Sequence, residues 1–104
     1  MRVLMQVLIP VEAGNSAIKD GSLMTTIKSS LEDLKAEAAY FAAVDGQRCG
    51  FVIFDLKATS DIPGIVERFF LGLNAKVSIY PVMTAQDLAA AEPGIAKAVA
   101  ASAG

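Results

Sequence analysis

The sequence predicts a single α+β domain in which a four-stranded antiparallel sheet carries two helices on one face. Four segments show strand-like patterns, two show apolar residues at helical spacing, and they follow one another in the order β-α-β-β-α-β. The chain has 104 residues, and two separate domains would each be too short to bury a core. We therefore assign residues 1–104 to one domain, with a core over 1–83 and a C-terminal helix and tail over 84–104.

The first strand and the first helix are predicted from two different periodicities. Apolar side chains alternate along Arg2 to Ile9, and the two sets differ mainly in that Gln6 makes one of them more polar. Pro10 ends this strand. An amphipathic helix is predicted from Ser22 to Lys35, where apolar residues recur at spacings of three and four, namely Leu23, Ile27, Leu31 and Leu34.

Asp45-Gly46 predicts a tight hairpin, because both central positions of such a two-residue turn take positive φ. Pairing outward from this turn sets the following residues opposite one another: Val44 and Gln47, Ala42 and Cys49, Tyr40 and Phe51, and Ala38 and Ile53. The hairpin thereby fixes which side chains share a face of the sheet.

A second helix follows the hairpin, with Ser60 as its N-cap and Pro63 in its first turn. Its buried stripe is predicted to comprise Ile65, Val66, Phe69, Phe70 and Leu73, with Gly72 and Asn74 suited to its exit. Lys76 to Met83 is predicted as the last strand, and Pro81 favours an edge position. Thr84 can cap a terminal helix through Asp87, with a break near Pro93 and a frayed tail.

With right-handed crossovers, this order of elements gives a ferredoxin-like sandwich with helices on one sheet face. The cluster predicted beneath the helices comprises Val3, Met5, Val7, Phe41, Val52, Phe54, Ile27, Leu31, Val66 and Phe70. The opposite, open face is predicted to carry Leu4, Gln6, Leu8, Tyr40, Phe51, Ile53, Ser78 and Tyr80. Because this open face is too apolar to remain in water, we expect a second sheet to cover it in a homodimer.

Composition excludes several classes of function. Nine Lys and Arg are scattered among eleven Asp and Glu, for a net charge of -2, so no basic surface for nucleic acid or anionic membrane is predicted. No apolar run approaches the length of a membrane span. The absence of histidine excludes Ser-His and Cys-His pairs, His-ligated haem and the usual zinc sites, and we expect neither metal nor cofactor. The single cysteine, Cys49, is interpreted as a buried thiol in a cytoplasmic protein.

The stretch Ile9 to Leu23, "IPVEAGNSAIKDGSL", is either a ligand loop or a junction between elements. We expect the first and third strands to be parallel neighbours, which would bring Asp55 close to Asn15 at one cavity mouth. A desolvated Asp55 would then have a raised pKa and serve as a base. As a junction, Gly14 and Asn15 would open a short helical turn, and the side chains of Asn15 and Ser22 would cap backbone amides. Asp55 would then be exposed or paired with a lysine.

The segments "CGFVIFDL", "SDIPGIVERFF" and "VSIYPVM", in this β-α-β-β-α-β order, resemble the dimeric α+β-barrel superfamily over residues 1–83. The muconolactone-isomerase-like branch and small bacterial proteins of no assigned activity are the most similar. The resemblance implies two sheets facing each other across a barrel, and the superfamily includes monooxygenases, isomerases and haem enzymes. This chain lacks the haem-ligating histidine and the His-Asp pair of some branches, so those sites are not carried over.

No catalytic motif in the sequence selects one function. The first hypothesis is a homodimer that binds a small amphipathic molecule in an apolar cavity between facing sheets, through Gln6, Asn15, Tyr40, Phe51 and Tyr80. A second is a cofactor-free isomerase, lyase or monooxygenase-like enzyme, in which Asp55 moves a proton on a small carbonyl or lactone. Tyr40, Tyr80 or Asn15 would then stabilise the oxyanion. A third is a purely structural assembly module.

Overall fold

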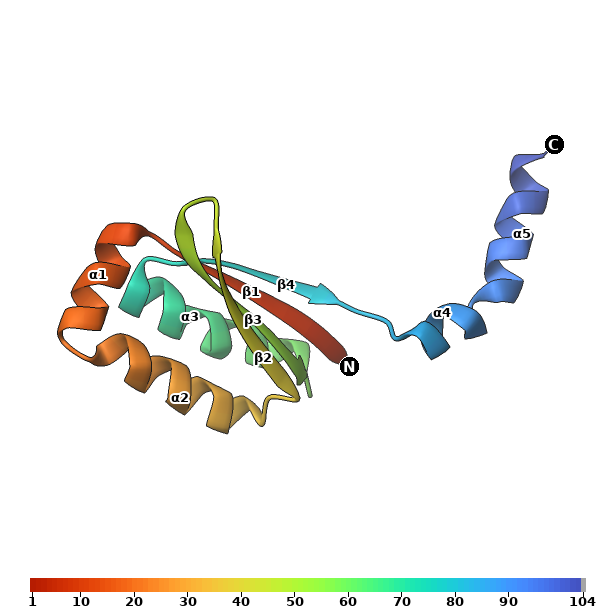
Figure 1. Cartoon of the computed structure of the whole chain (residues 1–104). Coiled ribbons are helices and arrows are strands. Elements are labelled where there is room, and N and C mark those ends of the chain that lie inside the picture. The colour runs from red at the N-terminus through yellow and green to blue at the C-terminus, as the bar shows by residue number, and fades with distance from the viewer. Residues whose placement is uncertain (104) are drawn as a thin grey trace.

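The computed structural model describes residues 1–103 and has the predicted α+β architecture (Figure 1). Its strands are β1 (Arg2–Ile9), β2 (Ala38–Val44), β3 (Gln47–Asp55) and β4 (Lys76–Pro81). Its helices are α1 (Val11–Lys19), α2 (Ser22–Leu34), the short 3-10 helix η1 (Thr59–Asp61), α3 (Ile62–Leu73), α4 (Ala85–Ala90) and α5 (Glu92–Ser102). None of these helices, within residues 1–103, combines the length and the apolar character that crossing a bilayer demands.

The four strands form one sheet in the order β2-β3-β1-β4, with every neighbouring pair antiparallel. All four hairpin pairings predicted from Asp45-Gly46 are present, and both turn residues have positive φ, 52° and 73°. β4 lies at an edge, as Pro81 predicted. The expectation that the first and third strands are parallel is wrong, since Arg2 pairs with Asp55 and Ile9 pairs with Arg48.

The hydrophobic core lies between the sheet and the helices α1, α2 and α3. Val3, Met5, Val7, Val52 and Phe54 are buried there, as strand alternation predicted, and Ile27 and Leu31 of α2 pack against them. Phe54 is 1% exposed and is among the largest fully buried side chains.

Three members of the predicted cluster, Val66, Phe70 and Phe41, are not buried in it. In α3 the buried side chains are Phe69 and Leu73, and Ile62 and Ile65 pack beside them, so these four form the stripe facing the sheet. Val66 is only half-buried and Phe70 is 39% exposed, because five closely spaced apolar residues make a stripe wider than one helix face can bury. Phe41 is on the predicted face but is 56% exposed, since no helix packs closely over it.

Left-handed residues join the elements of the core. Gly21, at φ 82°, is the N-cap of α2, while Lys35 and Asn74 end α2 and α3 at φ 50° and 51°. Asn74 therefore makes the predicted exit of α3. Ser60 does not cap α3: it lies in η1, and no side chain caps the helix, whose N-cap is Asp61.

The C-terminal arm, α4 and α5, extends away from the sheet and its helices (Figure 1). Thr84 and Asp87 form the predicted capping box at the start of α4, and the break falls between Ala90 and Glu92 beside Pro93. The tail is helical to Ser102. Neither helix has a buried residue, and Leu88, Ile95 and Val99 are exposed. The radius of gyration, 17.4 Å, correspondingly exceeds the roughly 13 Å of a compact domain of this length.

Candidate functional site

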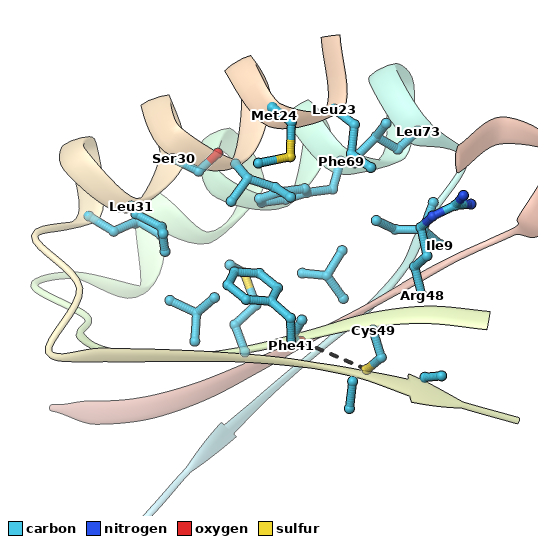
Figure 2. Close-up of a pocket in the computed structure, with 18 residues that line it drawn as sticks. Ile9, Leu23, Met24, Ser30, Leu31, Phe41, Arg48, Cys49, Phe69 and Leu73 are labelled. Atoms are coloured by element: carbon cyan, nitrogen blue, oxygen red, sulfur yellow. Dashed lines mark hydrogen bonds between the residues drawn. The ribbon is translucent and has the colours of Figure 1, made fainter. Parts of the chain in front are cut away.

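An apolar cavity of about 460 Å³ lies between α2 and the β2–β3 hairpin, on the helix side of the sheet (Figure 2). Its floor is formed by β1, β2 and β3, and its roof by α2 with the end of α3. The lining is apolar apart from a few groups at its edges, and includes Met5, Val7, Leu23, Met24, Ile27, Leu31, Phe41, Val52 and Phe69. A space of this size and character suits a small organic molecule.

The strand β3 shapes the cavity because its residue Gly50 has no side chain. Gly50 is buried on the helix side, and a Cβ placed there would lie 3.3 Å from the Phe41 ring. The ring therefore lies across Gly50 and forms part of the cavity wall, where Figure 2 shows it beneath α2. The cavity exists because the apolar side chains of α2 face the β2–β3 hairpin without filling the space between them.

Polar groups stand at two places along the cavity wall. Ser30 of α2 is 3% exposed and donates from its hydroxyl to the Thr26 carbonyl at 2.6 Å, while the hydroxyl accepts from Arg68 Nη1 at 3.0 Å. At the other end, Arg48 points from the start of β3 toward the helices (Figure 2). Its Nη2 donates to Asn15 Oδ1 at 3.1 Å.

A second, more polar cleft of about 560 Å³ adjoins the first cavity. Ser30, Leu34 and Phe69 line both. Two ion pairs line this cleft, Arg68 with Asp33 at 3.0 Å and Lys57 with Asp55 at 2.6 Å. Lys35 and Asp61 add one charge of each sign. The cleft therefore has little net charge to attract an ionic ligand.

Asp55 does not lie beside Asn15. Because β1 and β3 are antiparallel, Asp55 is at the start of β1 and Asn15 follows its end, about 25 Å away along the strand. Its carboxylate is exposed and accepts hydrogen bonds from Lys57 Nζ and from the Met1 ammonium, both at 2.6 Å. These bonds, that from Lys57 foremost, lower the pKa of Asp55 to about 2. The raised pKa expected of a ligand site is therefore wrong, because opposite charges favour the ionised carboxylate. The exposed, lysine-paired Asp55 expected of a junction is present.

The other predicted ligand residues lie on the open face, away from the cavity. Tyr40, Phe51 and Gln6 form one row across β2, β3 and β1, as their pairing requires. Tyr80 of β4 is in the next row, opposite Leu4. Tyr40 and Tyr80 are 66% and 48% exposed. The cavity expected between two facing sheets stays a prediction, because it would form only in a dimer.

Cys49 is buried, as predicted. Burial raises the pKa of its thiol, and a hydrogen bond from the Gln6 side chain offsets this in part. The group is thus a protonated thiol at neutral pH, without the lowered pKa of a nucleophilic cysteine.

The Ile9 to Leu23 stretch forms a complete helix, α1, and then the turn into α2. Asn15 is inside α1 and bonds to Arg48 rather than capping an amide. Ser22 does not cap either; its N–H donates to Asp20 Oδ1 at 2.8 Å. Hydrogen bonding to Ser22, through its side chain foremost and its backbone N–H second, lowers the pKa of Asp20. The expected capping was therefore wrong in its residues, although the junction itself is well ordered by hydrogen bonds.

The sequence prediction missed Arg48 and the cavity. Arg48 carries a signal that strand alternation provides: it pairs with Ile9 and so lies on the helix face, where a charged side chain is unusual. The cavity carries no such signal, because its shape depends on where α2 sits over the sheet. Within residues 1–103, no cluster of His, Cys, Asp or Glu is arranged to hold a metal ion.

A comparison with protein-family models and with curated protein sequences gives no match. Among solved structures, the chain is similar to 5-chloro-2-hydroxyhydroquinone dehydrochlorinase from Burkholderia phenoliruptrix AC1100, solved in complex with 2,5-dihydroxybenzoquinone. The TM-score is 0.62 at 16% identity, over 83% of this chain and 97% of the dehydrochlorinase. The likeness shows the fold alone. A de novo designed protein, Ferredog-Diesel, aligns with a TM-score of 0.48 at 9% identity, over 78% of this chain and 85% of the design.

Proposed function

We propose that this protein binds a small, largely apolar molecule in the cavity between α2 and the β2–β3 hairpin. The observation that carries the proposal is the cavity itself, which is about 460 Å³ and has an almost wholly apolar lining. Binding is favourable when a ligand covers such an apolar surface and displaces water from it. The dehydrochlorinase of similar fold holds a small quinone, which supports a small-molecule role for this fold.

The neutral fluorescent probe phenylnaphthylamine tests this function, because its emission rises when it enters an apolar site. We expect saturable binding to the native protein. Ala43 lines the cavity and is exposed, so Ala43→Phe should fill the space without disturbing the core and should weaken binding at least tenfold. Ala58→Phe, at an exposed position outside the cavity, is the matched control and should leave binding unchanged.

Equal binding by the native protein and the Ala43→Phe variant would show that the probe sits elsewhere and would contradict the proposal. Native mass spectrometry of protein taken directly from its host provides a second test. A retained small molecule that is lost in Ala43→Phe, but kept in Ala58→Phe, would identify the natural ligand.

A cofactor-free isomerase, lyase or monooxygenase-like enzyme is the second candidate, and the similarity to a dehydrochlorinase favours an enzyme. Within residues 1–103, the cavity lining contains no carboxylate or imidazole to move a proton. Asp55, exposed and with a pKa of about 2, is a weak base. Turnover of small lactones or quinols that survives in Asp55→Asn but is lost in Ala43→Phe would support an enzyme that acts without Asp55.

We further propose that two copies associate through the open face. Leu4, Phe51 and Ile53 are only half-covered in a single chain, and Tyr40 and Tyr80 are exposed beside them. Soluble monomers rarely leave a contiguous apolar surface of this kind in water. The C-terminal arm supports association too, since it continues from β4, whose Tyr80 belongs to the open face, and buries no residue within its own chain.

A further inference from the structure

Arg48 is the one charged side chain that lines the cavity, among the residues the structure describes. The chain has three arginines, and two of them are neutralised by carboxylates: Arg2 by Glu37 and Arg68 by Asp33, each at 3.0 Å. Within residues 1–103, Arg48 has no carboxylate at ion-pair distance. Its positive charge is thus left without a counter-ion at one end of an apolar space.

The guanidinium of Arg48 is held in a defined place. Asn15 Oδ1 accepts from Nη2 at 3.1 Å, which fixes one edge of the group. On the other side, Nη1 occupies the space that a side chain on Gly14 would need, since a Cβ there would lie 2.5 Å from it. Gly14 is inside α1, where alanine is otherwise the better helix former, so this glycine makes room for the guanidinium.

The bond to Asn15 uses one N–H of the Arg48 guanidinium and leaves its other N–H groups available to a ligand. A guanidinium has five N–H donors in a planar fork, and a neutral amide oxygen satisfies one of them without removing the charge. Carboxylates, phenolates and sulfonates offer the oxygens that such a fork binds, often in pairs. Beyond Arg48, the cavity offers only apolar side chains, the buried thiol of Cys49 and the already bonded Ser30.

We propose that the ligand is an amphipathic organic monoanion, whose acidic group binds Arg48 and whose apolar body fills the cavity beneath α2. The inference rests on the proposed function and adds the chemical class of the ligand. It also gives the Gly14-Asn15 segment a role in ligand recognition: Asn15 orients the arginine, and Gly14 admits it.

Two probes that differ mainly in charge test the proposal. Anilinonaphthalenesulfonate carries one negative charge, and phenylnaphthylamine has the same fused-ring and anilino body without it. We expect the native protein to bind the anion about tenfold more tightly, as one charge-assisted contact provides. The difference should shrink as sodium chloride is raised, because exposed charges are screened.

Three variants assign the preference to Arg48. Arg48→Gln should bind both probes with equal affinity, whereas Arg48→Lys should keep a reduced preference for the anion because it keeps the charge. Gly14→Ala should displace the guanidinium from its place and lower the preference for the anion, because a Cβ there would lie 2.5 Å from Nη1. Arg2→Gln, at an exposed arginine that lines neither the cavity nor the neighbouring cleft, is the matched control and should preserve the preference.

The outcomes separate the two proposals. Binding of the neutral probe with no preference for the anion, or a preference that persists in Arg48→Gln, would overturn the ligand class and leave the proposed function standing. Failure of the native protein to bind either probe would overturn both. If Arg48→Gln binds neither probe because it misfolds, the Gly14→Ala variant provides the test. An undiminished preference for the anion in Gly14→Ala would overturn the inference.

Discussion

At the scale of single residues, Phe54 shows how much one side chain contributes to stability. It is 1% exposed and packs at the centre of the layer between the sheet and the helices. Phe54→Ala should lower the free energy of unfolding by about 3–5 kcal/mol, because the lost ring leaves a cavity that the surrounding side chains cannot close. Urea denaturation followed by circular dichroism measures this change. A change below about 1 kcal/mol would contradict the assignment of Phe54 to the core.

Asp55 gives a prediction about pH. Its pKa is lowered in the folded protein to about 2, chiefly by Lys57. A lowered folded-state pKa means that the pairing stabilises the protein fully above the unfolded pKa near 3.8, and that this contribution is lost as pH falls toward 2. The denaturation midpoint should therefore drop between about pH 4 and pH 2, and this drop should be smaller in Asp55→Asn.

The matched control for this measurement is Asp61→Asn, another exposed carboxylate near the same end of the sheet, which makes no ion pair within residues 1–103. It should reproduce the native pH profile. Identical acid profiles for the native protein and Asp55→Asn would show that solvent screens the Asp55 pair completely.

At the scale of elements, substitution by alanine should change the stability of the protein in opposite directions at Gly21, the N-cap of α2, and at Gly72 in α3. Gly21 has φ 82° between α1 and α2, where an L side chain is strained, so Gly21→Ala should cost about 1 kcal/mol. Gly72 lies inside α3 with open space around it, so Gly72→Ala should stabilise the protein by about 0.5–1 kcal/mol. Chemical denaturation of both variants checks the signs. A stabilised Gly21→Ala would contradict the left-handed turn.

The elements also show where sequence reasoning succeeds. Strand alternation and the Asp45-Gly46 turn predicted both faces of the sheet and the hairpin register, because a period of two and a two-residue turn leave no freedom in the pairing. The helical stripe was less certain in α3, since Val66 and Phe70 fit the same spacing as Ile65 and Phe69. Local patterns cannot rank adjacent positions on one helix.

The candidate site was predicted poorly for a physical reason. The mouth expected around Asp55 depended on strand direction, and the antiparallel pairing of β1 with β3 places Asp55 at the opposite end from Asn15. The cavity depends on the separation between α2 and the hairpin, which arises from packing over the whole domain. Arg48 and Asn15 are 33 residues apart in the sequence, and only the folded structure brings them together.

At the scale of the whole molecule, the open face predicts the state of association. We expect the protein to be a dimer at micromolar concentration, with more than roughly 1,000 Å² of total surface buried. Tyr80→Glu should dissociate it, because a carboxylate placed in an apolar interface would be desolvated without a partner. Tyr80 is 48% exposed in one chain, so the monomer should remain folded. Sedimentation equilibrium measures the mass.

The control for this prediction is Leu71→Glu, which changes an 82% exposed apolar residue of α3 on the opposite side of the sheet. It should leave the dimer intact. A native protein that sediments as a monomer, with the open face in water, would refute association through this face.

We expect, finally, that the amount of helix in the C-terminal arm depends on the concentration of the protein. An isolated helix as short as α5, 11 residues, is marginal in water, and α5 has no contact that buries any of its side chains. In a dilute monomer its amide hydrogens should exchange with solvent almost as fast as those of an unfolded peptide, while those of β1 and β3 exchange only on global unfolding. Where a second copy packs against the arm, we expect the amides of the arm to exchange slowly. The exchange rates of the amides of Leu88, Ile95 and Val99 would thus report how long the assembly lasts. In a cell, unfolding of the arm in unassembled chains would expose them to proteases.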